Sequence, residues 1–234
     1  MALAIALSGV RSASAIKRAL IYAPFGPDNI TEDAEYLPGK GHLWVSYKWG
    51  FNDLTHICLL QARDGHFYQF DELVGTGVSE RDWVRQIIQR VVALPRYKGP
   101  TFEKWEKVWA SRVWPKPWPT VWPQAVGDPE AAQFRMELKE HGISATRPDK
   151  VKHPPEVGQD ILRAAIRSGQ SLRRLYIHPR CEETIKALSN YRARELPGGL
   201  FEALPDPDPA NQVFSHGADS LRFLFWRLRR ELGL

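Results

Sequence analysis

The chain has 234 residues, of which 43% are hydrophobic and 25% charged, a composition typical of one soluble globular domain, or of one domain with an arm. It excludes a disordered protein, a collagen-like one and a small disulfide scaffold, and no apolar run approaches the ~20 residues of a membrane span. The net charge of +5 permits a polyanionic partner without demanding one, and the two cysteines, Cys58 and Cys181, predict no disulfide framework.

The first part of the chain is expected to be an arm or linker. Residues 1–38 hold a short apolar stretch, without a positive segment before it, and then Pro24, Gly26, Pro27 and an acidic run. We therefore expect no secretory signal and little core in residues 1–38, and one domain over residues 39–234.

Three strands are predicted after Gly41. His42–Trp49 alternates, with Leu43, Val45 and Tyr47 on one face and Trp44, Ser46 and Lys48 on the other. A second apolar strand covers 54–61, and Asp64-Gly65 is a hairpin signal that leads into a third strand over 66–73. Tight connections between consecutive strands predict an antiparallel meander.

Helices and further strands follow. Ser79 has the features of a helix cap, and apolar residues from Trp83 to Val92 follow at helical spacing. The Pro- and Trp-rich residues 95–123 predict an irregular insertion whose tryptophans cover apolar surface, with a stacking platform as the alternative. The remaining elements are a strand over 120–126, a helix opened by Asp128-Pro129 and ended by Gly142, a helix over 155–167 with Val157 inward, a strand over 172–178, a helix over 179–190, a loop over 193–214 and a basic helix over 216–232. This order predicts one α/β domain with a mixed central sheet and helices on both faces.

Acidic residues at the ends of these elements are the candidate chemistry. Asp53 follows the first strand, Glu72 ends the third, Asp128 lies where the fourth strand meets a helix, and Asp219 is near the start of the last helix. Carboxylates gathered at one end of a sheet can hold two Mg²⁺ or Mn²⁺ ions for phosphodiester hydrolysis. The plainer alternatives are a helix cap for Asp128, a turn residue for Asp53 and a solvated strand end for Glu72. Phosphate-loop, serine-elbow and zinc-type motifs are missing, and Cys181 is interpreted as a buried structural cysteine.

Four motifs in order resemble the C-terminal nuclease domain of phage large terminase subunits. They are Trp44-Val-Ser-Tyr-Lys-Trp-Gly-Phe-Asn-Asp53 with Tyr68-Gln-Phe-Asp-Glu72, Val126-Gly-Asp-Pro-Glu-Ala131, Leu175-Tyr-Ile-His-Pro-Arg-Cys181, and His216-Gly-Ala-Asp-Ser-Leu-Arg-Phe223. The resemblance covers about residues 41–226. It implies an RNase H-like fold and metal-dependent cutting of concatemeric viral DNA during genome packaging.

The resemblance also implies roles and partners. Asp128 and Asp219 are the expected metal ligands, with Asp53 as an auxiliary acid and His216 as an orienting or proton-handling group. The expected partners are double-stranded DNA, a terminase ATPase domain, the small terminase subunit and the portal, in the host cytoplasm and without a membrane. Family members carry an ATPase motor before this domain, so the chain is expected to be the isolated nuclease part or a truncated product.

One position departs from the family. Lys48 stands where the resemblance places the first catalytic aspartate, and an ammonium cannot ligate a metal. Lys48 is therefore expected to be a cation among Asp128 and Asp219, the alternative being a different strand register with Lys48 in solvent. The second hypothesis for function follows: a nuclease-like domain that binds DNA or the packaging assembly without cutting. A third is a Holliday-junction or transposase-type enzyme of the same fold.

Basic residues predict where DNA would bind. They are Arg173, Arg174 and Arg180 around the fifth strand, and Arg222 and Arg227 on the last helix. Contacts of such residues with phosphates would give salt-dependent, sequence-independent binding. The alternative is a solvated helix face.

Overall fold

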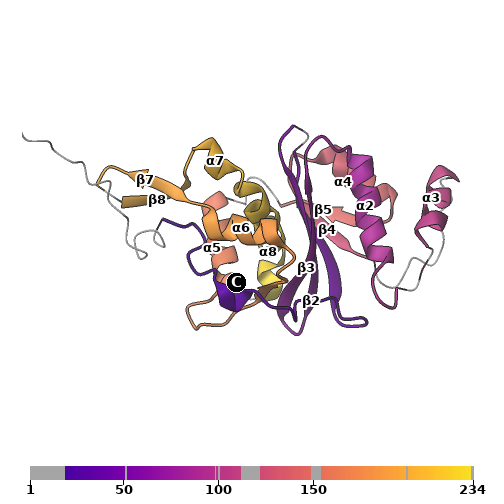
Figure 1. Ribbon diagram of the computed structural model, residues 1–234, viewed down its shortest axis with the longest axis horizontal. Coiled ribbons are helices and arrows are strands. Elements are labelled where there is room, and N and C mark those ends of the chain that lie inside the picture. The colour runs from indigo at the N-terminus through magenta and orange to yellow at the C-terminus, as the bar shows by residue number, and fades with distance from the viewer. Residues whose placement is uncertain are drawn as a thin grey trace, which may run out of the picture.

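The computed structural model describes residues 19–50, 52–97, 99, 101–111, 122–148, 154–198 and 200–232. Its centre is a six-stranded mixed sheet in the order β5-β4-β1-β2-β3-β6, with helices on both faces (Figure 1). The strands are β1 (His42–Lys48), β2 (Thr55–Arg63), β3 (His66–Gly75), β4 (Gln124–Gly127), β5 (Ser144–Thr146) and β6 (Leu175–Ile177). The predicted fold class, a mixed sheet between two layers of helices, is confirmed.

The first three strands form the predicted antiparallel meander. β1 pairs with β2 and β2 with β3, and the turn between the last two places Asp64 at φ 51° and Gly65 at φ 75°. Positive φ at both central residues matches the right-handed twist of a hairpin and suits an Asp-Gly pair. Alternation along β1 then sends Val45 and Tyr47 into one core cluster and Trp44 into the other, as predicted.

Two groups of helices cover the sheet. Helices α2 (Glu80–Val92) and α4 (Ala132–Glu140) lie on one face, and α5 (Pro155–Ile166), α6 (Glu182–Asn190) and α8 (Ser215–Leu232) lie on the other (Figure 1). Helix α2 begins where predicted, because the Ser79 side chain accepts a hydrogen bond from the Asp82 backbone nitrogen at 3.2 Å. None of the described helices is long and apolar enough to cross a membrane.

Several elements differ from the sequence-based expectations. Helix α3 (Phe102–Ser111) forms inside the segment predicted to be irregular, and β7 (Ala193–Leu196), β8 (Leu200–Pro205) and α7 (Pro209–Gln212) form inside the predicted 193–214 loop. The three-residue strand β5 was not predicted, because so short a segment shows no periodicity. The helix after Asp128 begins only at Ala132, and Val157, predicted to face inward, is 45% exposed.

Two tryptophans of the insertion pack inward. Trp105 is buried and stacks on Trp122, with ring centroids 4.9 Å apart and an interplanar angle of 13°. This agrees with the interpretation that the tryptophans cover apolar surface. The side chain of Trp109, together with Trp114 and Trp118, lies outside the described residues.

The described part of the expected arm belongs to the core. Ile21 and Tyr22 are each 1% exposed, and the Ile21 backbone nitrogen donates to the Tyr191 carbonyl at 2.9 Å. The short helix η1 (Pro27–Asn29) follows, and the Asn29 side chain donates to the Ile166 and Leu175 carbonyls. The expectation of little core is therefore wrong for residues 19–38, while residues 1–18 lie outside the described structure.

Candidate functional site

Lys48 and Asp128 meet at the ends of two adjacent parallel strands. Tyr47 of β1 is the register partner of Gly127 of β4, so the residues that follow them leave the sheet side by side. The Lys48 Nζ atom lies 2.5 Å from Asp128 Oδ2, and the two side chains are 23% and 5% exposed. Lys48 therefore points to an acid of the predicted site, and the alternative of a different register with Lys48 in solvent does not apply.

The backbone holds Asp128 in place. Its amide donates to the Tyr47 carbonyl at 3.0 Å, its Oδ1 atom accepts from the Glu130 amide at 2.9 Å, and Arg135 donates to its carbonyl at 2.5 Å. The expectation of a helix cap is replaced by a tight turn, because the helix starts at Ala132. Gly127 permits the close approach of the two strands, since a Cβ atom there would lie 2.4 Å from the Tyr47 carbonyl oxygen.

Helix α8 brings His216 and Asp219 to the same end of the sheet. Burial lowers the pKa of His216, as does the charge of Lys48, while Asp219 and Asp53 act in the opposite direction. His216 therefore lies within electrostatic reach of three of the predicted site residues. Asp53 itself is exposed in the loop after β1.

Asp219 is paired with an arginine from its own helix. The Arg222 Nε atom donates to Asp219 Oδ1 at 2.8 Å, and the Arg222 side chain is only 8% exposed. Burial acts to lower the pKa of Arg222, but Asp219 outweighs it and the pKa is raised. Arg222 is thus a buried counter-ion of Asp219, and its predicted contact with DNA stays a prediction.

The acids as arranged do not fit a divalent metal. Each predicted ligand has a cationic partner, Lys48 for Asp128 and Arg222 for Asp219. Within the described part of the chain, no group of three or more His, Cys, Asp or Glu side chains could hold a metal ion. Mg²⁺ and Mn²⁺ require several oxygen ligands that are free of competing cations. Here the negative charges of Asp128 and Asp219 are instead neutralised by the side chains of Lys48 and Arg222.

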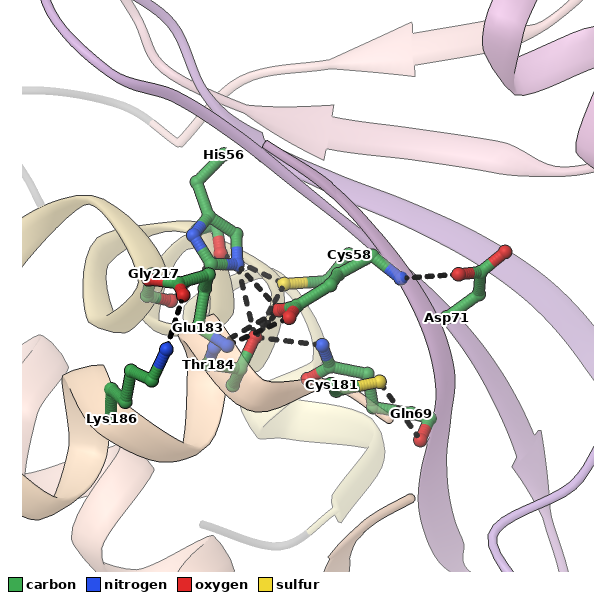
Figure 2. Close-up of polar contacts among 11 residues, drawn as sticks. His56, Cys58, Gln69, Asp71, Cys181, Glu183, Thr184, Lys186 and Gly217 are labelled. Atoms are coloured by element: carbon green, nitrogen blue, oxygen red, sulfur yellow. Dashed lines mark hydrogen bonds and ion pairs between the residues drawn. The ribbon is translucent and has the colours of Figure 1, made fainter. Parts of the chain in front are cut away.

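Glu72 lies in a buried polar network that the sequence did not reveal. The network is next to this end of the sheet, because His56, the partner of Glu72, is the register partner of Lys48 across β1 and β2. Figure 2 shows this network between β2, β3 and the start of α6. His56 Nε2 lies 3.2 Å from Glu72 Oε2 and 3.0 Å from Thr184 Oγ1. Glu72 also accepts from the amides of Glu183 and Thr184, at 2.8 and 3.0 Å, so a carboxylate caps the positive end of α6. The alternative of a solvated strand end is wrong for Glu72.

The network carries an ion pair. Burial acts to lower the pKa of His56, but Cys58 and Glu72 outweigh it and raise the pKa to about 9. Burial acts to raise the pKa of Glu72, but hydrogen bonds and charge from His56, with hydrogen bonds from Thr184 and Glu183, lower it. His56 is therefore cationic and Glu72 anionic at neutral pH, which makes their burial tolerable.

The network also supports the start of α8. Ser220 Oγ lies 3.1 Å from Cys58 Sγ, and a Cβ atom on Gly217 would lie 3.0 Å from the His56 ring. Residues 217 and 220 lie on either side of Asp219 in the sequence. The contacts of these residues with β2 therefore fix the position of Asp219 relative to the sheet. The sequence contained only a weak indication of this network, namely that His56 and Cys58 are two polar residues on one face of an apolar strand.

The other arginines differ in how accessible they are. Arg173 pairs with Asp28, Arg180 with Glu35, and Arg174 donates to the Leu232 carbonyl. The Arg227 side chain is 45% exposed and lies 3.3 Å from Glu231. Arg227 and Arg180, 48% exposed, are the more accessible of the predicted DNA contacts.

Both cysteines are buried and free. Burial is the main cause that raises the pKa of Cys181, so the thiol stays protonated. This agrees with the interpretation of Cys181 as a structural residue.

The six-stranded mixed sheet between two layers of helices, with Lys48 and Asp128 at the ends of neighbouring strands and Asp219 on the last helix, is an RNase H-like fold. Solved structures of phage large terminases share this fold. The large terminase of a thermophilic bacteriophage, in complex with ADP, superposes with a TM-score of 0.65 at 17% identity over 88% of this chain and 44% of that one. The nuclease domain of the large terminase g2p of bacteriophage SPP1, with bound Mn, gives a TM-score of 0.53 at 16% identity over 85% of this chain and 94% of that one.

These comparisons establish the fold and confirm, at that level, the resemblance to terminase nuclease domains. The chain spans less than half the length of the thermophilic phage terminase. No protein-family model matches the sequence, and a search of the curated proteins finds no match.

Proposed function

We propose that this chain is a terminase nuclease-like domain that binds double-stranded DNA without cutting it. The observation that carries the proposal is the 2.5 Å contact between the Lys48 ammonium and the Asp128 carboxylate. The resemblance places the first catalytic acid at position 48, so in this chain a cation replaces a ligand.

Charge compensation explains why a lysine in place of the first catalytic acid would prevent phosphodiester hydrolysis. Clustered carboxylates repel one another unless a cation lies between them, and Lys48 supplies that cation from the chain itself. A bound divalent ion would lower the pKa of a water molecule and stabilise a leaving oxygen, and an ammonium does neither. The paired site therefore keeps the architecture of the domain and loses the reaction.

DNA binding would use the exposed arginines. Arg227 and Arg180 now form surface ion pairs with Glu231 and Glu35, and such pairs contribute little to stability. Both arginines can therefore leave these carboxylates and bind phosphates. Arg173 and Arg174 would have to give up the contacts that they make now. Such contacts position DNA without reading its sequence.

The setting of the domain is part of the proposal. The fold shared with the large terminase of the thermophilic phage suggests that the domain acts next to an ATPase domain. Packaging of viral DNA in the host cytoplasm, with the small terminase subunit and the portal as further partners, would follow from that relationship.

The second candidate is an active endonuclease, in which Asp128 and Asp219 hold Mg²⁺ or Mn²⁺ after their cationic partners move away. What favours it is that His216 is influenced by Asp219, Asp53 and Lys48 together, so the acids share one end of the sheet. The related SPP1 domain is described with bound Mn.

One experiment separates the two. The purified chain is incubated with supercoiled plasmid and Mn²⁺ or Mg²⁺, and DNA retardation is measured on the same samples. The expected result is retardation that weakens with salt, and no nicking. Nicking that disappears in Asp219→Asn would instead establish the second candidate, because asparagine keeps the volume of the side chain but loses the charge that holds a divalent ion.

A further inference from the structure

A cavity of about 300 Å³ lies at the N-terminal end of β1, bordered by residues 39–43, Tyr36, Gln61 and Trp122. Lys48 ends the same strand, and seven residues at ~3.3 Å each separate the two sites by roughly 20 Å. The cavity is therefore distinct from the acidic site, and its function is independent of the one proposed above.

The loop over the cavity is held firmly. The Gln61 side chain accepts from the Leu37 amide at 2.8 Å and donates to the Leu37 carbonyl at 2.7 Å and to the Lys40 carbonyl. Gly41 adopts φ 57°, and a Cβ atom there would lie 1.8 Å from the Ala62 carbonyl oxygen. Only glycine allows the loop to approach β2 so closely, so the rim of the cavity is preformed.

Two aromatic side chains form fixed walls. The ring of Trp122 stacks on that of the buried Trp105, with ring centroids 4.9 Å apart, and the ring of Tyr36 packs against that of Phe70, with ring centroids 5.7 Å apart. Because both rings are held from behind, a planar ligand would meet them without a loss of side-chain freedom.

The charge of the lining points to an anion. Lys40 is exposed at the rim between Gly39 and Gly41, both of which have positive φ. None of the described residues that line the cavity is acidic. A lysine on a glycine-rich loop is a common partner of phosphate groups, because its ammonium acts as a point charge beside accessible backbone.

We propose that this cavity binds a small phosphorylated aromatic compound of the size of a nucleoside 5′-monophosphate. The base would lie against Trp122 and Tyr36, and the phosphate would bind Lys40. The cavity volume is at the lower end of the ~300–1,000 Å³ of small-molecule sites, which favours a mononucleotide over a dinucleotide cofactor. The same chemistry occurs in a free nucleotide and in the 5′-phosphorylated end of a DNA strand.

The test is calorimetric titration of the full chain with adenosine 5′-monophosphate and, separately, with a 5′-phosphorylated tetranucleotide. Adenosine and ribose 5-phosphate, which each lack one half of the ligand, serve as truncated probes. Lys40→Gln removes the cation at an exposed position, and Lys186→Gln on α6, on the other face of the sheet, is the matched control.

The expected result is one site per chain, an affinity for the monophosphate that falls at least about tenfold in Lys40→Gln and is unchanged in Lys186→Gln, and weaker binding of both truncated probes. Binding of the tetranucleotide alone would assign the site to strand ends, and binding of both would assign it to nucleotides in general. The proposal is overturned if neither binds, if Lys40→Gln binds as tightly as the unmodified chain, or if adenosine binds as tightly as its monophosphate.

Discussion

Lys48→Asp should turn a site that is compensated by the chain itself into one that requires a metal ion. The substitution removes the ammonium 2.5 Å from Asp128 and places a further carboxylate beside Asp128, at the end of the sheet where Asp219 also acts on His216. In the absence of metal these carboxylates repel one another, and in its presence they form a set of oxygen ligands.

The magnitude follows from the burial of the pair. Breaking a buried ion pair costs about 3–5 kcal/mol, and the 23% exposure of Lys48 places this pair near the lower limit, at about 3 kcal/mol. At ~2–4 °C per kcal/mol for a chain of this size, the melting temperature in EDTA should fall by about 6–12 °C. Mn²⁺ at ~100 times its dissociation constant should restore about 2.7 kcal/mol, because it binds only the folded state.

The assay is thermal unfolding in EDTA and across a Mn²⁺ titration, with plasmid cleavage followed in parallel. Lys48→Met is the control, because it removes the cation without adding a ligand and should lower the melting temperature without creating a response to Mn²⁺. If Lys48→Asp melts like the unmodified chain in EDTA and does not respond to Mn²⁺, Lys48 does not compensate the site and the reasoning is refuted.

Two further predictions concern the residues that support the site, and a third concerns DNA binding. Gly217→Ala should destabilise the fold by about 1–3 kcal/mol in urea unfolding, because the new Cβ atom would lie 2.8 Å from a side chain of α6 and 3.0 Å from the His56 ring. The pKa of His56 in the folded chain, about 9, exceeds its usual 6.5, so the stability that its charge supplies should be complete below pH 6.5 and fall by about 3 kcal/mol as the pH rises through 9. Glu72→Gln should flatten this dependence of the free energy of unfolding on pH, measured by urea unfolding between pH 6 and 10. Arg227→Gln should weaken DNA binding and reduce the slope of log affinity against log salt by about 1, whereas Arg222→Gln should mainly lower the melting temperature.

Each has a matched control. Gly169→Ala adds a Cβ atom that meets nothing within 4 Å and should leave stability nearly unchanged, so equal losses at the two glycines would contradict the packing argument. An unaltered pH slope in Glu72→Gln would remove the ion pair as its cause. For DNA binding, Arg90→Gln changes an exposed arginine on the opposite face, and an equal effect there would show that Arg227 makes no particular contact.

Local features of the sequence determined much of the sheet. Alternation from His42 to Lys48, the Asp64-Gly65 turn and the Ser79 cap each depend on a few neighbouring residues, and all three appear as predicted. The same locality explains the failures: strand β5 has three residues, and the β7–β8 hairpin interrupts a Pro- and Gly-rich segment, so neither displays a periodic pattern.

The candidate site was predicted in part. Motif order placed Lys48, Asp128 and Asp219 together, and the structure brings Lys48 to Asp128 across 80 residues of chain. Lys48 was the expected cation beside Asp128, but the pairing of Asp219 with Arg222 was not predictable, because Arg222 could face DNA or Asp219 from the same helical position.

Only the tertiary structure decided which polar groups are buried. His56, Glu72 and Thr184 come from two strands and a helix, and their pairing becomes favourable only when all three are removed from water together. Spacing along the chain determines which face a residue occupies, whereas its charge state and partner depend on what a distant element places against that face. The sequence therefore specified the strands that place Lys48 and Asp128, whereas the pairing of β1 with β4 decided that Lys48 meets Asp128, and the packing of α6 against the sheet decided that Glu72 meets His56 in a buried network.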